Sequence, residues 1–253
     1  MLASPIVSGE HVSLAIKGLA QQQGIQAKGV MAPTWLASSV IIAARLLLSA
    51  LEATTLDLVK CQALVASIVG FLFLSRASTI CNILPSDFAV VNRSLLFRES
   101  YRKSKLVPVP RVLQFRLEPA SPAWAIVVYC EVLKLRRSDL MGQSMVSLYA
   151  QVSPAARIEA CLTTVAKLVE KDVGGVVPTS SHCLRRGGAV SMLAVGVPLT
   201  KICEWGHWAG EPSIRTYITG RAFQCPSPAD RVCFEWLAGT NISVHDESPS
   251  TLV

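Results

Sequence analysis

The sequence predicts a mainly α-helical protein with a small β region near its middle. Residues 35–51 and 61–75 form two strongly apolar runs of the length of buried helices. Residues 158, 162, 165 and 169 are apolar and repeat at steps of three and four, as on one face of a helix. Residues 113–118 instead alternate apolar and polar side chains, which indicates a half-buried strand.

The first part of the chain contains a leader and then the two apolar runs. Residues 1–31 are mixed in composition, and we expect a leader or linker without a core of its own. The runs at 35–51 and 61–75 contain Arg45 and Gln62. Both fall short of the roughly 20 residues that cross a bilayer, where a charge is costly. We therefore expect two helices buried in a globular core, with a small membrane protein as the alternative.

The middle of the chain is predicted to form short strands at 96–101, 106–109 and 113–117. Pro108 and Pro110 indicate an edge or an exit, because proline has no N–H for the ladder. The basic turn 102–105 lies between the first two strands and by itself suggests a solvated hairpin tip.

Helices follow in the second half. Residues 122–135 are predicted as a helix and 136–152 as a connection. The next helix is expected to begin with Ser153 as its cap and to stop at Gly174. Short helices are expected after Pro198, after Pro212 and around 232–237. The polar tail from residue 241 is expected to be loose.

Composition limits the compartment and the partners. The net charge is +7 and the isoelectric point is near 9.1, which suits a polyanion but indicates only non-specific attraction. The eight cysteines are scattered without a CxxC pair, and no secretory signal precedes them. We expect a reducing compartment and no disulfide framework.

Residues 181–217 contain four side chains whose spacing is typical of a single active site. His182 and Arg185 are three positions apart, so they would share a helix face. Trp208 follows 23 positions after Arg185, with His207 directly before it, and Tyr217 comes nine positions after Trp208.

This layout resembles the C-terminal signature of the tyrosine recombinases, also called the phage integrase family. In that family His-x-x-Arg is followed by His or Trp and then by the nucleophilic Tyr. The neighbouring glycines at 187, 188 and 206 fit best the branch of DIRS-like and Crypton-like mobile elements. The resemblance implies a mostly helical catalytic domain with a small three-stranded antiparallel sheet, over residues 32–240.

The resemblance also implies roles for individual residues. It makes Tyr217 the nucleophile, His182 a general acid/base, and Trp208 the indole donor to a phosphate oxygen, with His207 as the rival for that position. Arg185 and Arg76 would neutralise the phosphate. Without the resemblance, Arg76 suggests only a cation at the C-terminus of the second apolar helix, where the helix dipole favours one.

A lysine on the 102–105 hairpin would protonate the leaving group. Lys103 is the first choice and Lys105 the second. Arg102, Arg186 and Arg215 are expected to contact the DNA backbone.

Three other interpretations use the same residues. Residues 189–205 resemble a helix-turn-helix, which would make the region a DNA-binding module without chemistry. His182, Cys183, Cys203 and His207 are possible zinc ligands, although the usual paired-cysteine spacing is missing. A type IB topoisomerase would share the catalytic residues and relax supercoils.

The family implies double-stranded DNA as the partner, four protomers on paired sites, and no metal or other cofactor. We expect no membrane association, and a location in the nucleus of a eukaryote or otherwise in the cytoplasm. Full family members carry a further N-terminal helical domain that closes around the DNA. Because only about 30 residues precede the catalytic part, we expect a fragment or a decayed mobile element.

Overall fold

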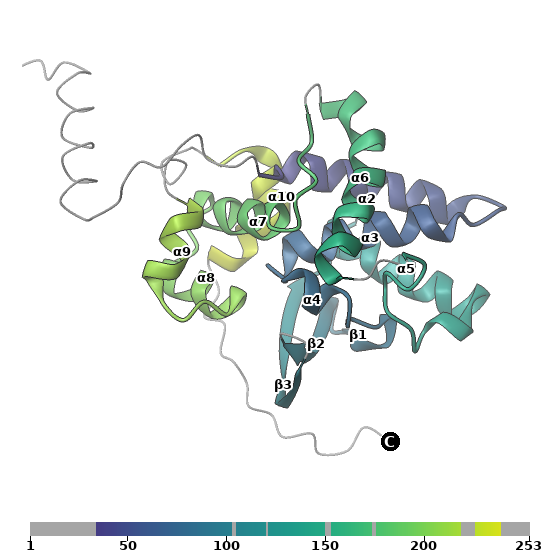
Figure 1. Cartoon of the computed structure of the whole chain (residues 1–253), viewed down its shortest axis with the longest axis horizontal. Helices are drawn as coiled ribbons and strands as arrows, with labels where there is room; N and C mark the ends of the chain where they lie inside the picture. The colour runs from purple at the N-terminus through teal and green to yellow at the C-terminus, as the bar shows by residue number, and fades with distance from the viewer. Residues whose placement is uncertain are drawn as a thin grey trace, which may run out of the picture. The chain divides into compact units, whose positions relative to one another are not determined.

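The computed structural model describes residues 34–102, 105–119, 121–149, 153–173, 176–218 and 226–238, with the side chains of 100–112, 216 and 217 outside that description. Within these residues the chain is mostly helical and carries a three-stranded antiparallel sheet (Figure 1). The predicted fold class is confirmed. The predicted leader at 1–31 and tail at 241–253 lie outside the described residues.

Helix α3 (Leu58–Leu72) forms the centre of the core. Its residues from Cys61 to Leu72 are all buried, which explains why the sequence there is apolar on every face. Four helices pack around it: α2 (Ala37–Glu52), α5 (Pro122–Arg136), α6 (Pro154–Val173) and α7 (Cys183–Ala194). None of the helices in the described part of the chain is both long enough and apolar enough to span a bilayer. The two apolar runs are therefore core helices, as predicted.

The chain turns sharply after α3. Leu74 has a left-handed backbone with φ of 49°, which is uncommon for a bulky side chain. Arg76 follows as the N-cap of the short helix α4 (Ala77–Ile80), and η1 (Pro85–Asp87) comes after it. The expectation of a cation at the C-terminus of the apolar helix was therefore wrong: α3 ends before the turn, and Arg76 begins the next helix.

The sheet contains β1 (Phe88–Val91), β2 (Ser94–Arg102) and β3 (Lys105–Arg116), in that order. The predicted strands at 106–109 and 113–117 are one continuous strand, β3. Its two prolines are tolerated because β3 is an edge strand. The third strand is β1, which was not predicted because its residues are mostly exposed and show no alternation of burial.

One face of the sheet is covered by an aromatic cluster. Phe73, just after α3, lies 4.5 Å from Phe97 and 4.7 Å from Phe115 between ring centroids. Leu95 is also buried, so alternate residues of β2 face the helices. The sheet is thus held against the end of α3, next to the turn that leads to Arg76.

Helices α5 (Pro122–Arg136) and α6 (Pro154–Val173) lie where the periodicity predicted them, joined through η2 (Ser138–Leu140). The Ser153 hydroxyl accepts a hydrogen bond from the Ala156 N–H at 3.2 Å, which confirms its role as a cap. The apolar stripe of α6 is buried along its length. Gly174, the predicted stop, lies outside the described residues.

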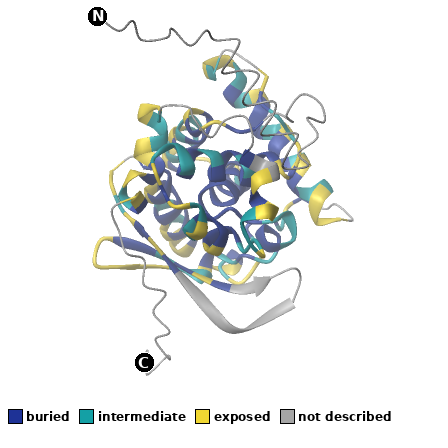
Figure 2. Cartoon of the chain, turned by 90° about the vertical axis from the view of Figure 1, so that its left-hand side faces the viewer, coloured by how far each residue is buried: buried dark blue, intermediate teal, exposed yellow. Residues whose placement is uncertain are grey.

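The last group contains α7 (Cys183–Ala194), α8 (Leu199–Gly206), α9 (Glu211–Ile218) and α10 (Pro228–Ala238). Helices α7, α8 and α9 contact one another, and α10 packs on α7 and α2 (Figure 1). Coloured by burial, the helices turn dark-blue faces inward and yellow faces outward (Figure 2).

Helix α7 approaches its neighbours very closely. A Cβ at Gly187 would lie 2.2 Å from the Trp35 carbonyl oxygen, and one at Gly188 would lie 2.2 Å from that of Phe71. Since no real Cβ tolerates such a contact, the two glycines allow α7 to lie against α3 and the segment before α2. This packing fixes the position of the first turn of α7, which carries Arg185.

Candidate active site

Arg185 is the centre of the candidate site. Its side chain leaves the first turn of α7 and is only 3% exposed. Its Nη1 donates to the Leu74 carbonyl at 2.6 Å, and its Nη2 donates to the Gly206 carbonyl at 2.5 Å. The guanidinium carbon also lies 3.8 Å from the ring centroid of Trp208. Three segments far apart in the sequence therefore meet at one cation.

Arg76 lies close to this meeting point. It is half-buried, and it follows by two residues the Leu74 whose carbonyl binds Arg185. Two residues span at most about 7 Å of chain. The turn after α3 thus brings the Arg76 backbone near Arg185, although more than a hundred residues separate the two in sequence.

The turn after α8 supplies the other side of the site. His207 has a left-handed backbone with φ of 54° and ψ of 47°. Its N–H donates to Glu204, and the Trp208 N–H donates to Cys203 at 2.9 Å, which together form a Schellman motif. Glycine usually occupies the position of His207, so the motif here carries a small strain. A Cβ on the preceding Gly206 would lie 1.8 Å from the Trp208 ring, so only glycine leaves room for the indole.

Glu99 is a member of the site that the sequence analysis missed. It lies on β2 with only 6% of its surface exposed, and its Oε2 makes a short hydrogen bond with the His207 Nε2. The signal was present in the alternation of β2, because Leu95, Phe97 and Glu99 occupy the same buried face. A glutamate on the apolar face of a strand needs a partner, and His207 is that partner.

His182 lies at the start of α7, three residues before Arg185. It is the N-cap of α7 and is exposed, whereas Arg185 is buried. Its backbone N–H donates to the Ser180 Oγ at 3.4 Å. Its backbone is already helical, with φ of −87° and ψ of −16°, and the helix face that it would share with Arg185 stays a prediction.

The remaining predicted residues are described only in part. Lys103 lies outside the described residues, and Lys105 and Arg102 are paired backbone positions at the tip of the β2–β3 hairpin. Tyr217 is the penultimate residue of α9, a helix that contacts α7 and α8. The side chains of these residues are outside the description, so their catalytic roles remain predictions.

The predicted DNA contacts differ in their surroundings. Arg215 is exposed and pairs with Glu211 at 3.1 Å along α9. Arg186 is half-buried beside Arg185 on α7. Arg215, exposed and paired with a glutamate one helical turn away, therefore lies where an ordinary surface cation would lie. The DNA contacts of both arginines stay predictions.

A hollow of about 350 Å³ adjoins the turn after α8. His207 and Trp208 line it together with Cys203 and the glutamates 204 and 211. Burial, reinforced by the negative charges of Glu211 and Glu204, raises the pKa of the Cys203 thiol. Burial also raises the pKa of Cys183 to about 12. Within the described residues, no three histidine, cysteine or acidic side chains gather as a metal site.

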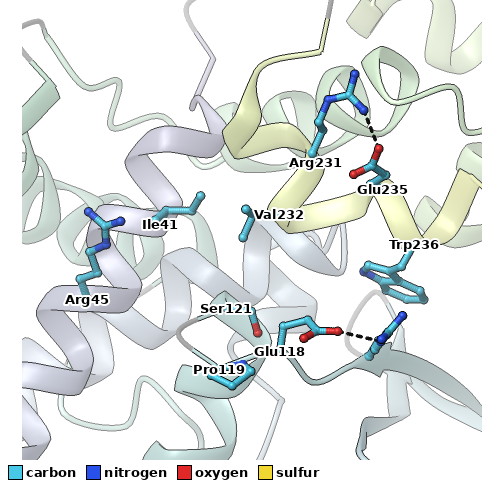
Figure 3. Close-up of a pocket in the computed structure, with 10 residues that line it drawn as sticks. Ile41, Arg45, Glu118, Pro119, Ser121, Arg231, Val232, Glu235 and Trp236 are labelled. Carbon is cyan, nitrogen blue, oxygen red and sulfur yellow. Dashed lines mark hydrogen bonds and ion pairs between the residues drawn. The ribbon is translucent and has the colours of Figure 1, made fainter.

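A second hollow of about 520 Å³ lies elsewhere, between α2, the end of β3 and α10 (Figure 3). Arg45, Arg116 and Arg231 line it. Figure 3 shows Arg231 paired with Glu235. The Arg231–Glu235 pair is 2.5 Å long, and Arg116 pairs with Glu118 at 2.7 Å. Neither hollow is lined by Arg76 or Arg185.

Comparison with known proteins gives matches only among solved structures. The sequence matches no protein-family model and no curated protein. The chain is similar to the XerH site-specific recombinase bound to its difH substrate, with 13% identity and a TM-score of 0.49 over 82% of this chain and 60% of that one. It is also similar to the XerA recombinase, with 17% identity and a TM-score of 0.48 over 84% of this chain and 72% of that one.

A third similar structure is a lambda integrase dimer bound to a core site, with 13% identity and a TM-score of 0.45 over 86% of this chain and 74% of that one. This chain thus spans 60% of the length of the XerH chain.

Proposed function

We propose that residues 32–240 form the catalytic domain of a site-specific DNA recombinase of the integrase type. Residues 1–31 would be a linker, and 241–253 a polar tail. The domain would cut and rejoin double-stranded DNA through a 3′-phosphotyrosine, without metal or ATP. The observation that carries the proposal is the setting of Arg185, a buried cation fixed between the turn that precedes Arg76 and the turn that bears His207 and Trp208.

Fixed cations suit the cleavage of a phosphodiester. Negative charge builds on the non-bridging oxygens in the transition state, and a cation held in place stabilises it without reorganisation. The two carbonyl bonds and the indole leave the Arg185 guanidinium little freedom. Arg76, half-buried at the N-cap of α4, would supply the second guanidinium. Trp208, whose ring already lies against Arg185, would donate its indole N–H to a phosphate oxygen.

The covalent step would belong to Tyr217. Its phenol oxygen would attack the phosphorus, form the phosphotyrosine bond and expel the 5′ oxygen of the next nucleotide. Lys103, or Lys105 in its place, would give that oxygen its proton. The exposed His182 would accept the phenol proton. Because the phosphotyrosine bond retains the energy of the broken linkage, rejoining would need no ATP.

The alternative is a DNA-binding remnant that uses α7 and α8 as a helix-turn-helix. The two helices are joined by a tight turn in which Gly196 has φ of 86°. However, α8 exposes Thr200 and Glu204, while Lys201 is half-buried. Thr200 and Glu204 have side chains that can contact base edges, but the Glu204 carboxylate would also be repelled by the DNA phosphates. The charge on the outer face of α8 therefore weakens this alternative.

The test is covalent trapping on a nicked suicide DNA substrate, which prevents rejoining. The wild-type chain should form a protein–DNA adduct, and Tyr217→Phe should form none. Tyr129→Phe is the matched control, because its hydroxyl is buried and has no hydrogen-bond partner within the described structure. An undiminished adduct in Tyr217→Phe would reject the nucleophile, and binding without any adduct would favour the remnant.

The wider context is also part of the proposal. We expect four protomers on two paired DNA sites, an origin in a mobile element, and action in the nucleus of a eukaryote or otherwise in the cytoplasm. A plasmid relaxation assay separates this activity from that of a type IB topoisomerase. Relaxation by a monomer, without pairing of sites, would favour the topoisomerase.

A further inference from the structure

The contact between Glu99 and His207 joins the sheet to the turn after α8. Both side chains are almost fully buried, with 7% and 9% of their surfaces exposed. A buried carboxylate is costly unless a hydrogen-bonding partner compensates it. The imidazole fills this role, and the pair therefore fixes the distance between β2 and the turn.

The turn itself binds Arg185 on both sides of His207. The carbonyl of Gly206 accepts from the Arg185 Nη2, and the ring of Trp208 lies over the guanidinium. His207 lies between these two residues, with its backbone in the left-handed region and its ring on Glu99. A change at His207 that moved its backbone would therefore also move the two residues that contact Arg185.

We propose that Glu99 is a positioning residue of the candidate active site. Its carboxylate holds the His207 imidazole from the side of the sheet and so fixes the turn that binds Arg185. This inference rests on the proposed recombinase function. It gives His207 a holding role and leaves Trp208 as the member of the pair that faces Arg185, which resolves the choice that the sequence left open.

The same contact ties the lysine hairpin to the arginine. Glu99 precedes Arg102, the end of β2, by three residues, or about 10 Å along a strand. The hairpin that carries Lys103 and Lys105 therefore extends from the strand that Glu99 anchors.

A different role for the same residues would be a Cys203–His207–Glu99 catalytic triad. Such a triad needs a thiol that loses its proton easily. Here burial and the neighbouring Glu211 and Glu204 raise the pKa of Cys203, in the opposite direction. This direction disfavours the triad, and the contact of the His207 Nε2 with Glu99 is consistent with a structural link between sheet and turn.

The experiment compares Glu99→Gln with the control Glu118→Gln, which removes the charge of an exposed glutamate paired with Arg116. We expect Glu99→Gln to lower the single-turnover rate constant of adduct formation by 10- to 100-fold and to change DNA affinity by less than about twofold. Glu118→Gln should match the wild type. A merely destabilised variant would lose the amplitude of adduct formation and keep its rate constant.

A double-mutant cycle sharpens the result. If Glu99 acts through His207, Glu99→Gln combined with His207→Gln should be no slower than the slower single variant. Multiplying effects, or a Glu99→Gln rate constant equal to that of Glu118→Gln, would overturn the inference.

A second readout does not depend on activity. The ¹⁵N-imidazole NMR signals of His207, assigned by their loss in His207→Gln, should move in Glu99→Gln and stay in place in Glu118→Gln. If the wild-type chain forms no adduct, the proposed function fails, but the NMR signals still show whether Glu99 contacts His207. Unmoved signals in Glu99→Gln would overturn the inference that Glu99 positions His207.

Discussion

The molecule holds its arginines in two opposite ways. Arg185 is 3% exposed and is bound by two carbonyls and an indole from distant segments. Arg116 and Arg231, at the larger hollow, have side chains that are 71% and 51% exposed, and each pairs with a glutamate close to it in sequence (Figure 3). Exposed pairs of this kind contribute roughly 0.2–1 kcal/mol and are screened by salt. A guanidinium fixed in the interior holds the segments of a site in place, whereas a paired guanidinium on the surface mainly keeps the protein soluble.

The largest expected effect is that of Arg185→Lys. The ammonium group is a point charge without the planar fork that reaches both carbonyls and the indole. It would leave at least one buried carbonyl unpaired, at a cost of roughly 1–3 kcal/mol. We expect adduct formation to fall by about 10²- to 10³-fold. Denaturant unfolding and adduct kinetics measure the two losses.

Arg231→Lys is the matched control for this comparison. It should change the free energy of unfolding by less than about 0.5 kcal/mol and leave the adduct rate intact. Equal losses in Arg185→Lys and Arg231→Lys would show that the contrast between the two sites has no functional meaning.

The next effect is that of Gly206→Ala. The new Cβ would overlap the Trp208 ring at 1.8 Å, so the indole must leave its place over Arg185. We expect a destabilisation of about 1–3 kcal/mol and a drop in adduct rate of at least tenfold. Gly142→Ala is the control, because nothing lies within 4 Å of its Cβ position. A Gly206→Ala protein with wild-type kinetics would place Trp208 outside the chemistry.

A smaller effect concerns pH and the buried thiols. Burial raises the pKa of Cys61 to about 11 and the pKa of Cys130 and of Cys161 to about 12. An unfolded thiol titrates near 8.5. Between about pH 9 and pH 11 the unfolded chain therefore loses protons that the folded chain keeps, and the free energy of unfolding falls as pH rises.

The slope of unfolding free energy against pH measures this contribution. Cys130→Ala should reduce the slope between pH 9 and pH 11. Asp139→Asn should not change it, because the hydrogen bond from Arg137 lowers the pKa of Asp139 and confines its titration to acid pH. A free energy of unfolding that is constant from pH 9 to pH 11 would contradict the buried state of these thiols.

The predictions from sequence succeeded where a local pattern decides the structure. The apolar faces of α2, α3 and α6 and the Ser153 cap were readable because helix periodicity and capping act within a few residues. The sheet was read less well. β1 is short and exposed, and it was not predicted. The prolines of β3 indicated an edge or an exit, and the structure shows the edge, although the two strands predicted around them are one strand.

Only those parts of the site that depend on distinctive side chains could be predicted from the sequence. The spacing singled out Arg185, His207 and Trp208, which the structure brings to one place. The carbonyls of Leu74 and Gly206 carry no sequence signal, because every residue has one. The alternation of β2 placed Glu99 on the buried face, but its partner His207 is more than a hundred residues away and could not be identified from that pattern. Without the family resemblance, Arg76 suggested a cation at the end of the apolar helix, because the left-handed turn at Leu74 is not visible in the sequence; its catalytic role stays a prediction.

The smallest effect concerns Tyr129, a buried polar group that lies in the core rather than at either arginine site. Its hydroxyl is fully buried on α5 and has no hydrogen-bond partner within the described part of the chain. Removing an unpaired buried hydroxyl removes its desolvation cost and leaves no other group unsatisfied. Tyr129→Phe should therefore leave the free energy of unfolding unchanged or raise it by up to about 1 kcal/mol.

Tyr149→Phe is the comparison, because the Tyr149 hydroxyl donates to the Val59 carbonyl at 3.1 Å and its loss should destabilise the fold. If Tyr129→Phe lost as much stability as Tyr149→Phe in denaturant titration, the Tyr129 hydroxyl would have a partner in solution, and the distinction between satisfied and unsatisfied polar groups in this core would fail.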